Sequence, residues 1–360
     1  MLKRDQTYQV LLKRIGSGLW KPGDKLPAEP VLCRELGVAR VTLRAAMEQL
    51  AAEGYLSRSR PAGTIVTVPD EMRKKILVVT SPDDSDIPEI SRPVFYIIPG
   101  IERRCMELNI ETENMSSVFL PGELPENYLG VILLACNFRG NEEILKKVRA
   151  LTVPAVNAHA FPADPKVTGL PSVVTGFWPA FLAGLSHLTL MGHRRIGFVM
   201  QKRELTCQRF SITEREFALQ LRRSGIEFDE RLVIRVERSN MDFSGELHDL
   251  LFSDDPPTAL YTYSDFYALR CYEMLKKWNI RIPEEIAVMG FSGYTAAALQ
   301  SPPLSTVDFG YARIGRIAVD LLRQQDQWFG KSIPVIYSPY EVIPRRSTDC
   351  FRMNFRTPKT

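Results

Sequence analysis

The spacing of hydrophobic residues changes near residue 70 of this 360-residue chain. Before that point apolar residues recur every three or four positions, as on one face of a helix; Leu43, Ala46, Met47 and Leu50 are an example. After it, short continuous apolar runs such as Ile76–Thr80 alternate with helical segments. Such runs are typical of parallel sheets that are covered on both faces. We therefore predict a small helical domain followed by a larger α/β domain.

The first domain, residues 1–68, is predicted to be a winged helix-turn-helix. After an N-terminal amphipathic helix, a second helix is expected over Ala28–Leu36, and Gly37 ends it because glycine adopts the left-handed conformation of a helix terminus without strain. A third helix is expected over Arg40–Glu53. Leu56–Ser59 and Thr64–Val68 are then predicted to be two strands joined by a Pro-Ala-Gly turn.

Basic residues cluster where such a domain meets DNA. Arg40, Val41 and Arg44 lie near the start of the third helix, away from the centre of its apolar face. A recognition helix presents these positions to base edges in the major groove, where arginine can bond guanine O6 and N7 together. Arg58 and Arg60 flank the turn of the wing, within reach of phosphates or the minor groove. The distribution of charge agrees with DNA binding by this domain, because residues 1–75 carry a net charge of +6 and the rest of the chain carries −2.

The motifs of this first domain resemble those of the GntR family of transcription factors. The matching stretches are Pro22–Glu29 (Pro-Gly-Asp-x-Leu-Pro-x-Glu), Gly37–Arg44 (Gly-Val-x-Arg-x-Thr-x-Arg) and Gly63–Val66 (Gly-Thr-x-Val). The resemblance implies that Arg40, Thr42 and Arg44 contact double-stranded DNA, helped by the wing at Gly63. Two departures, Ala39 for Ser or Thr and Pro30 for Arg, each remove a possible contact, so the operator sequence is not carried over.

The second domain is predicted to hold two lobes, because two consecutive runs of alternating strands and helices follow one another after a linker at residues 69–75. Within residues 76–345 we expect one lobe over about 76–173 plus 302–328 and the other over about 174–301 plus 329–345, with a tail at 346–360. Ligands of such sheets bind beyond the carboxyl ends of the strands.

Three stretches of this domain resemble LacI-type repressors, whose bodies have a periplasmic-binding-protein fold: Gly192–Phe198, Ile282–Phe291 and Pro302–Val307. A GntR head on a LacI-type body is the arrangement of the arabinose-repressor subfamily. The resemblance implies an α/β fold with two parallel-sheet lobes after the winged helix-turn-helix. It also implies a homodimer that binds a palindromic operator as a repressor and releases it when a sugar-like effector binds.

The same resemblance places candidate effector-binding residues at strand ends. Tyr261 and Asp265 fall where the LacI-type pattern meets its ligand, and Ser292 stands where sugar binders commonly have an aspartate that accepts hydrogen bonds from hydroxyls. Arg209 lies one turn before the place of the family's arginine, and Phe95 or Tyr96 would supply an aromatic platform. Without the aspartate, an ordinary monosaccharide is a less natural ligand.

Other compartments and chemistries find little support in the sequence. No apolar run approaches the ~18–20 residues of a membrane span, and no signal-peptide pattern is evident. Six scattered cysteines without a C-x-x-C pair fit a reduced cytoplasmic protein, and the four histidines lack metal-ligand spacing, so no cofactor or metal is expected.

Three functions remain open at this point. The first is an effector-controlled transcriptional regulator. The second is a constitutive DNA-binding dimer whose effector pocket has degenerated, which the missing aspartate keeps open. The third is an enzyme with a GntR head and an aminotransferase-like, pyridoxal-phosphate body, but the chain after the head is too short for that body and shows no recognisable cofactor lysine or other catalytic motif. We therefore predict no enzymatic activity.

Overall fold

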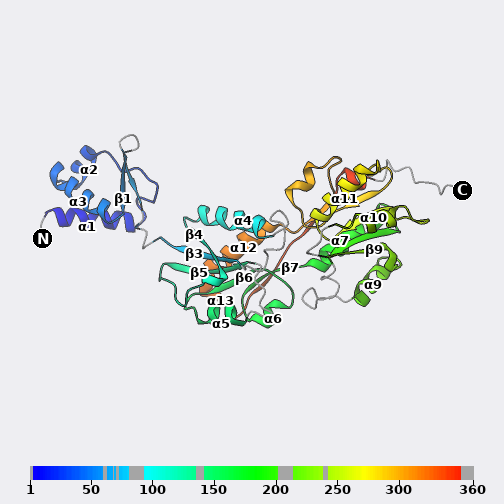
Figure 1. Ribbon diagram of the computed structural model, residues 1–360. Helices are drawn as coiled ribbons and strands as arrows, with labels where there is room; N and C mark the ends of the chain where they lie inside the picture. Colours follow the sequence, from blue (N-terminus) through cyan, green and yellow to red (C-terminus); the bar gives the residue numbers. More distant parts are fainter. Residues whose placement is uncertain are drawn as a thin grey trace. The chain divides into compact units, whose positions relative to one another are not determined.

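The computed structural model describes residues 3–59, 63–67, 69, 73–80, 93–134, 142–201, 214–237 and 242–349. The chain divides into two compact units, Met1–Lys75 and Ile76–Thr360 (Figure 1). Arg60 and Arg209, two of the candidate site residues, lie outside the described residues.

The first unit consists of three helices and a hairpin. The elements are α1 (Lys3–Gly16), α2 (Glu29–Leu36), α3 (Arg40–Ala52), β1 (Leu56–Ser59) and β2 (Gly63–Val66). β1 and β2 are antiparallel, and the backbone around residues 23–26 pairs with β2. The winged helix-turn-helix order is therefore confirmed, with the second strand starting and ending slightly earlier than expected.

Apolar residues from all three helices form the core of this unit. Leu11, Leu32, Leu43 and Leu50 are buried there together. Gly37 ends α2 in the left-handed conformation, at φ 61°, which lets the chain turn directly into α3. The helical spacing in the sequence thus reports the packing of α3 against α1 and α2.

The second unit begins with a six-stranded sheet in the order β13-β7-β6-β5-β3-β4. Its strands are β3 (Lys75–Thr80), β4 (Glu111–Ser116), β5 (Tyr128–Leu134), β6 (Ala155–Ala160), β7 (Ser172–Thr175) and β13 (Val335–Ser338). β5, β6, β7 and β13 pair in parallel. The associated helices are α4 (Val94–Glu107), α5 (Glu142–Ala150), α6 (Asp164–Thr168), α12 (Tyr311–Arg323) and α13 (Gln325–Trp328).

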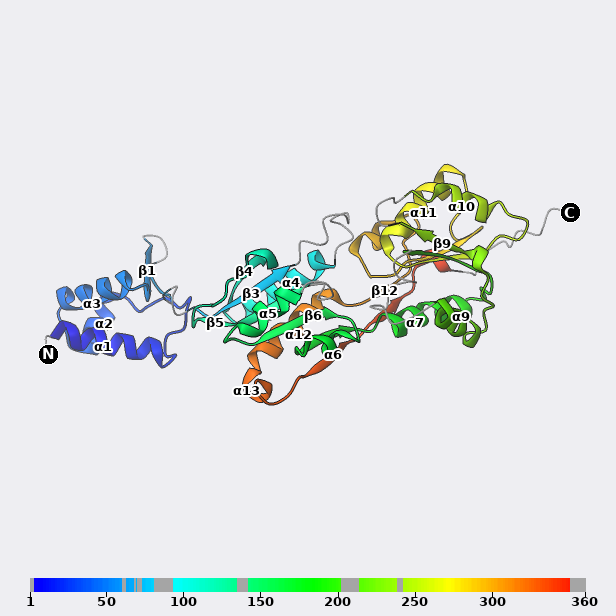
Figure 2. The same ribbon diagram turned by 60° about the horizontal axis from the view of Figure 1, so that its bottom comes forward.

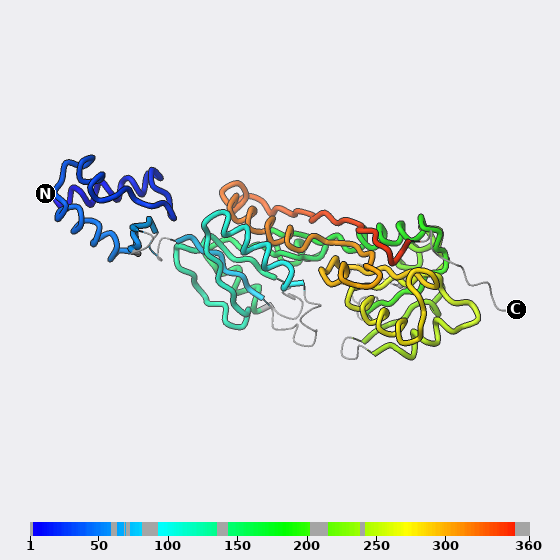
Figure 3. Tube along the Cα trace, turned by 90° about the horizontal axis from the view of Figure 1, so that it is seen from above, coloured from blue at the N-terminus to red at the C-terminus, as the bar shows by residue number. Residues whose placement is uncertain are grey.

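Helices α4 and α12 cover one face of this sheet, whereas α5 covers the other. Figure 3 shows the traces of α4, in cyan, and α12, in orange, side by side. The backbones of the two helices are in direct contact, with no side chain between them. A Cβ atom added at Gly100 would lie 2.0 Å from the carbonyl oxygen of Ala312, and one added at Gly315 would lie 2.5 Å from the carbonyl oxygen of Ile97. Glycine at both positions is what permits this approach.

A four-stranded parallel sheet in the order β11-β10-β8-β9 forms the second lobe. The strands are β8 (Ile196–Gln201), β9 (Val233–Val236), β10 (Ala259–Thr262) and β11 (Ala287–Met289). The helices are α7 (Phe177–Leu190), α9 (Glu214–Arg223), α10 (Ser244–Leu251) and α11 (Asp265–Lys277). Aromatic residues of α7 and α9 pack on one face, and apolar residues of α10 and α11 on the other.

A separate two-stranded antiparallel sheet is formed by β12 (Thr306–Asp308), labelled in Figure 2, and β14 (Glu341–Ile343). The remaining short helices are η4 (Ser117–Phe119), η6 (Glu230–Leu232), η7 (Thr295–Leu299) and η8 (Arg346–Thr348).

One detail differs from the expected division into lobes. Residues 329–345 were expected in the second lobe, but β13 pairs with β7 in the first sheet, because strand pairing depends on a partner far away in the sequence.

Within the described part of the chain, no helix is long and apolar enough to cross a membrane. The same residues contain no cluster of three or more potential metal ligands.

Candidate DNA interface and effector region

The start of α3 presents an exposed, basic surface. Arg40 is its first residue and Arg44 follows one turn later, with side chains that are 62% and 50% exposed. Between them Val41 is 80% exposed, and Thr42 is half-buried. The opposite face of α3 is buried in the core of the unit, so these residues lie on the side that is open to a partner.

Glu29, in the first turn of α2, connects the two arginines. Its Oε2 atom lies 2.7 Å from Nε of Arg40 and 2.9 Å from Nε of Arg44. The hydrogen bond from Arg40 lowers the pKa of the Glu29 carboxyl, so this group is a carboxylate at neutral pH. The sequence motif contains Glu29, but nothing in the pattern of residues indicated that both arginines bind it.

The wing lies next to the basic segment around Lys25. The Leu26 amide donates to the Thr64 carbonyl at 2.9 Å, which adds this segment to the hairpin. Gly63 has φ +87°, and a Cβ atom there would lie 2.7 Å from Cε of Lys25, so glycine allows the lysine to cross the wing. Arg58 is partly exposed, with Nη1 3.7 Å from Oε1 of Glu48.

Tyr96 is the best placed of the candidate effector-binding residues. Its ring, on α4, stacks on Tyr294 after β11, with centroids 4.3 Å apart and planes 15° apart. Tyr311, the first residue of α12, lies 6.1 Å from Tyr96 and 5.5 Å from His159 of β6. Aromatic residues from several elements therefore meet here. Phe95, the neighbouring candidate, is 49% exposed.

Ser292 lies in the same region. It is buried with φ 131°, and its amide donates to the Val307 carbonyl at 2.9 Å. Its side chain partly offsets the rise in the pKa of Tyr294 and Tyr311 that their burial causes. The structure thus brings Tyr96 and Ser292 together around Tyr294.

Asp265 and Tyr261 are occupied by contacts inside the protein. Oδ2 of Asp265 accepts from the Tyr294 amide at 2.6 Å, and Oδ1 accepts from the Thr306 hydroxyl at 2.5 Å. Burial raises the pKa of this carboxyl to about 6, against the opposing effect of the Thr306 hydrogen bond. Tyr261 is fully buried; its ring stacks on Phe181, and its hydroxyl donates to the Phe181 carbonyl at 3.1 Å. In this structure the contacts of both residues stabilise the second lobe.

Among the buried polar side chains at the first sheet, the Asn157 amide, at Nδ2, and the Thr175 hydroxyl have no hydrogen-bond partner among the described residues. Asn157 is the third of the six residues of β6 and pairs with Ser172, the first residue of β7. Thr175 is the last residue of β7, so it lies at the carboxyl end of a parallel strand. His159, two residues beyond Asn157, has the unusual φ of 60°. The sequence prediction included neither residue, although Thr175, a polar residue at the end of an apolar strand, was a usable signal.

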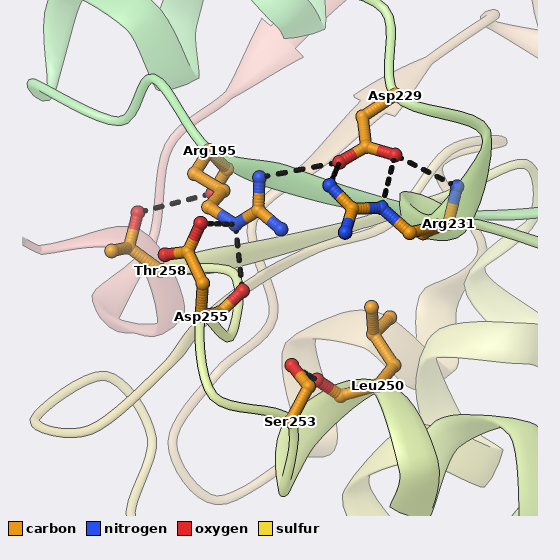
Figure 4. Close-up of polar contacts among 7 residues, drawn as sticks. All are labelled: Arg195, Asp229, Arg231, Leu250, Ser253, Asp255 and Thr258. Atoms are coloured by element: carbon orange, nitrogen blue, oxygen red, sulfur yellow. Dashed lines mark hydrogen bonds and ion pairs between the residues drawn. The ribbon is translucent and has the colours of Figure 1, made fainter.

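The second lobe also contains a polar network around the Gly192–Phe198 motif, drawn in Figure 4. Arg195 binds the Asp255 carbonyl through Nε at 2.7 Å and faces Asp229 at 3.5 Å. Hydrogen bonds from Arg231 lower the pKa of Asp229 to about 2. His193 lies 2.9 Å from the Thr258 hydroxyl, and burial lowers its pKa to about 4, so it is neutral. These contacts fix the start of β8 and bring no reactive group to a surface.

Comparison with known proteins agrees with this geometry. Residues 3–66 match the gntR family of bacterial regulatory proteins, and residues 185–348 match the periplasmic binding protein-like domain. The chain is 24% identical to the arabinose metabolism transcriptional repressor of Halalkalibacterium halodurans, over 94% of this chain and 95% of that protein. The corresponding repressor of Geobacillus stearothermophilus is 25% identical, over 95% and 96%.

Solved structures show the same fold. The lac repressor dimer bound to operator and the anti-inducer ONPF has a TM-score of 0.62 at 18% identity, covering 86% of this chain and 89% of that one. The complex of the transcriptional regulator CelR with cellobiose has a TM-score of 0.58 at 19% identity, covering 89% and 100%.

The fold and the exposed basic start of α3 therefore define a DNA-binding transcriptional regulator, not an enzyme. More particularly, the chain combines a domain that matches the gntR family with one that matches the periplasmic binding protein-like domain, as expected for a protein similar to the arabinose metabolism transcriptional repressors.

Proposed function

We propose that this protein represses transcription and releases its operator when a small polar molecule, sugar-like in its hydroxyl groups, binds at the carboxyl ends of β6 and β7. The unpartnered, buried Thr175 hydroxyl, at the carboxyl end of β7, carries this proposal. A buried polar group without a partner costs about 1–3 kcal/mol, so such groups are retained where a ligand satisfies them. Relatives of this chain are named repressors, and the similar CelR was solved with cellobiose.

The aromatic cluster of Tyr96, Tyr294 and Tyr311 suits a ring. Tyr96 stacks face to face on Tyr294, and a sugar or other flat ring would replace one partner in that stack. We include Ser292 in the site because it is two residues before Tyr294, on which Tyr96 stacks. Phe95 would contribute from the exposed side. We leave out Tyr261 and Asp265, whose polar atoms are used within the second lobe.

The rest of the proposed mechanism concerns the assembly. We propose that residues 1–68 bind DNA, that 69–75 link them to the effector domain at 76–345, and that two copies of the chain bind a palindromic operator in the reducing cytoplasm. A dimer places two recognition helices in successive major grooves. An effector that prefers one conformation by about 1–3 kcal/mol changes DNA affinity ~5–150-fold.

A second candidate is a DNA-binding dimer that no longer responds to a ligand. The observation in its favour is that Tyr96, Tyr294 and Tyr311 already pack on one another, and that Ser292 replaces the aspartate of sugar binders. In this case Tyr96 is a packing residue and the protein represses constitutively.

A thermal-shift screen of the full chain against sugars, sugar acids, sugar phosphates and nucleosides separates the two. A ligand at ~100 times its Kd adds about 2.7 kcal/mol to the stability of the folded state. We expect a hit that also weakens DNA binding, and we expect Thr175→Val to abolish the shift while Thr189→Val, in the last turn of α7, retains it. A broad panel without a hit, with DNA binding intact, would favour the constitutive protein.

A further inference from the structure

The two arginines at the start of the recognition helix share one acidic partner. Glu29 accepts the Nε hydrogens of Arg40 and Arg44, and its side chain is only 24% exposed. Among the described residues the hydrogen bonds and ion pairs of both guanidiniums run through Nε to Glu29, so the hydrogens of the terminal nitrogens are available to another partner. A carboxylate at the surface that meets DNA needs an explanation, because it repels phosphates.

Neither the stability of the fold nor the packing of α2 explains why Glu29 lies at this surface. Exposed ion pairs contribute little to folding, and α2 is already anchored by the fully buried Leu32. Arginine side chains are flexible, and ordering them on DNA costs entropy. A guanidinium held by Nε keeps the fork of its terminal nitrogens available for the two acceptors of guanine, O6 and N7.

We propose that Glu29 is a positioning residue for base recognition: it orders Arg40 and Arg44 for guanine before DNA arrives. The same negative charge weakens attraction to phosphates, but it does so for operator and unrelated DNA alike. The ordering of the two arginines is therefore what raises the ratio of specific to non-specific binding. An anion at the first turn of α2 is itself favoured by the helix dipole, which keeps the carboxylate charged.

The test uses the full chain and an operator selected with it from a pool of random DNA. Glu29→Gln keeps the size of the side chain and removes its charge. Glu35→Gln is the matched control, since Glu35 lies on the same helix but pairs with Arg14, 3.0 Å away. Affinities for the operator and for unrelated DNA are measured at several salt concentrations, together with the melting temperature of each variant.

We expect Glu29→Gln to lower the ratio of specific to non-specific affinity about tenfold, the effect of weakening one bidentate base contact. Binding to unrelated DNA should be as tight as before or tighter, and Glu35→Gln should leave the ratio unchanged. Replacing the contacted guanines by 7-deazaguanine, which lacks N7, should weaken the unmodified protein more than the Glu29→Gln variant.

Other outcomes overturn the proposal. Equal tightening on both DNAs would show that Glu29 only repels phosphates. Weakening on both, with a lower melting temperature, would show that it supports the fold. A third experiment keeps the proposal testable if the single variant folds poorly. In a protein that already carries Arg40→Ala and Arg44→Ala, Glu29→Gln should have no further effect on the ratio of specific to non-specific affinity. A persisting effect would show that Glu29 does not act by ordering the two arginines.

Discussion

Asp265 stands at the position that the sequence indicated, directly after the loop that follows β10, but both oxygens of its carboxylate accept hydrogen bonds from the protein. The sequence gives the place of a residue along a strand and not the partners that surround it. Asn157 and Thr175 show the reverse case. Each lies in a short, largely apolar strand, and its significance comes only from burial without a partner.

Arg44 tests the DNA interface at a single residue. We expect Arg44→Ala to weaken binding to the selected operator by about 1–3 kcal/mol and to relax the base preference at one position of each half-site. Arg323→Ala, an exposed change at the end of α12, serves as the control. Operator affinities from fluorescence anisotropy check this. An equal loss on operator and unrelated DNA would mean that Arg44 binds only phosphate.

Asp265 predicts a pH dependence of stability. Its pKa is about 6 in the folded protein and 3.8 in the ordinary state, so between about pH 4 and pH 6 the folded form holds a proton that the unfolded form has lost. The contribution of this carboxyl to stability therefore falls as pH rises through that window, by up to ~3 kcal/mol. Urea unfolding at pH 4, 5, 6 and 7 should show a slope that Asp265→Asn removes. Parallel pH profiles for the two proteins would refute it.

At the scale of elements, burial decides which strands the sequence reveals. β3, β5, β8 and β10 are buried on both faces and appear in the sequence as continuous apolar runs, the pattern from which the parallel sheets were predicted. β4 (Glu-Thr-Glu-Asn-Met-Ser) was missed because it is an edge strand with polar side chains. β13 was assigned to the other lobe because its partner β7 lies far away in the chain. Periodicity reports local burial, and pairing between distant strands leaves no such pattern.

The contact between α4 and α12 gives a prediction at this scale. Gly100→Ala places a methyl group against the Ala312 backbone, which cannot move aside, and we expect a loss of about 1–3 kcal/mol in stability. Gly245→Ala, in α10, meets nothing within 4 Å and should be neutral or slightly stabilising. Chemical denaturation of the two variants provides the comparison. If both behave alike, the close approach of the helices is not tight in solution.

At the scale of the whole molecule, the chain consists of two units with separate cores. We expect limited proteolysis between them to leave two folded fragments, residues 1–75 and the remainder. Because the net positive charge belongs to the first fragment, that fragment should retain salt-dependent, weak binding to DNA, whereas the second should bind none. Circular dichroism and gel shifts of the separated fragments check this. Unfolding of either fragment upon cleavage would show that the two cores depend on each other.

The backbone contact at Gly100 and Gly315 has a mechanical consequence. Side chains between helices can change rotamer and absorb a small displacement, but here each helix touches the other's peptide groups directly. One helix cannot slide or turn unless the other moves with it, so we expect α4 and α12 to move together as one rigid body, a single rod. Tyr96 and Tyr311 sit on that rod. A ring that wedges these tyrosines apart from Tyr294 would therefore tilt the whole rod, and the far ends of both helices would swing through a larger arc than the tyrosines themselves.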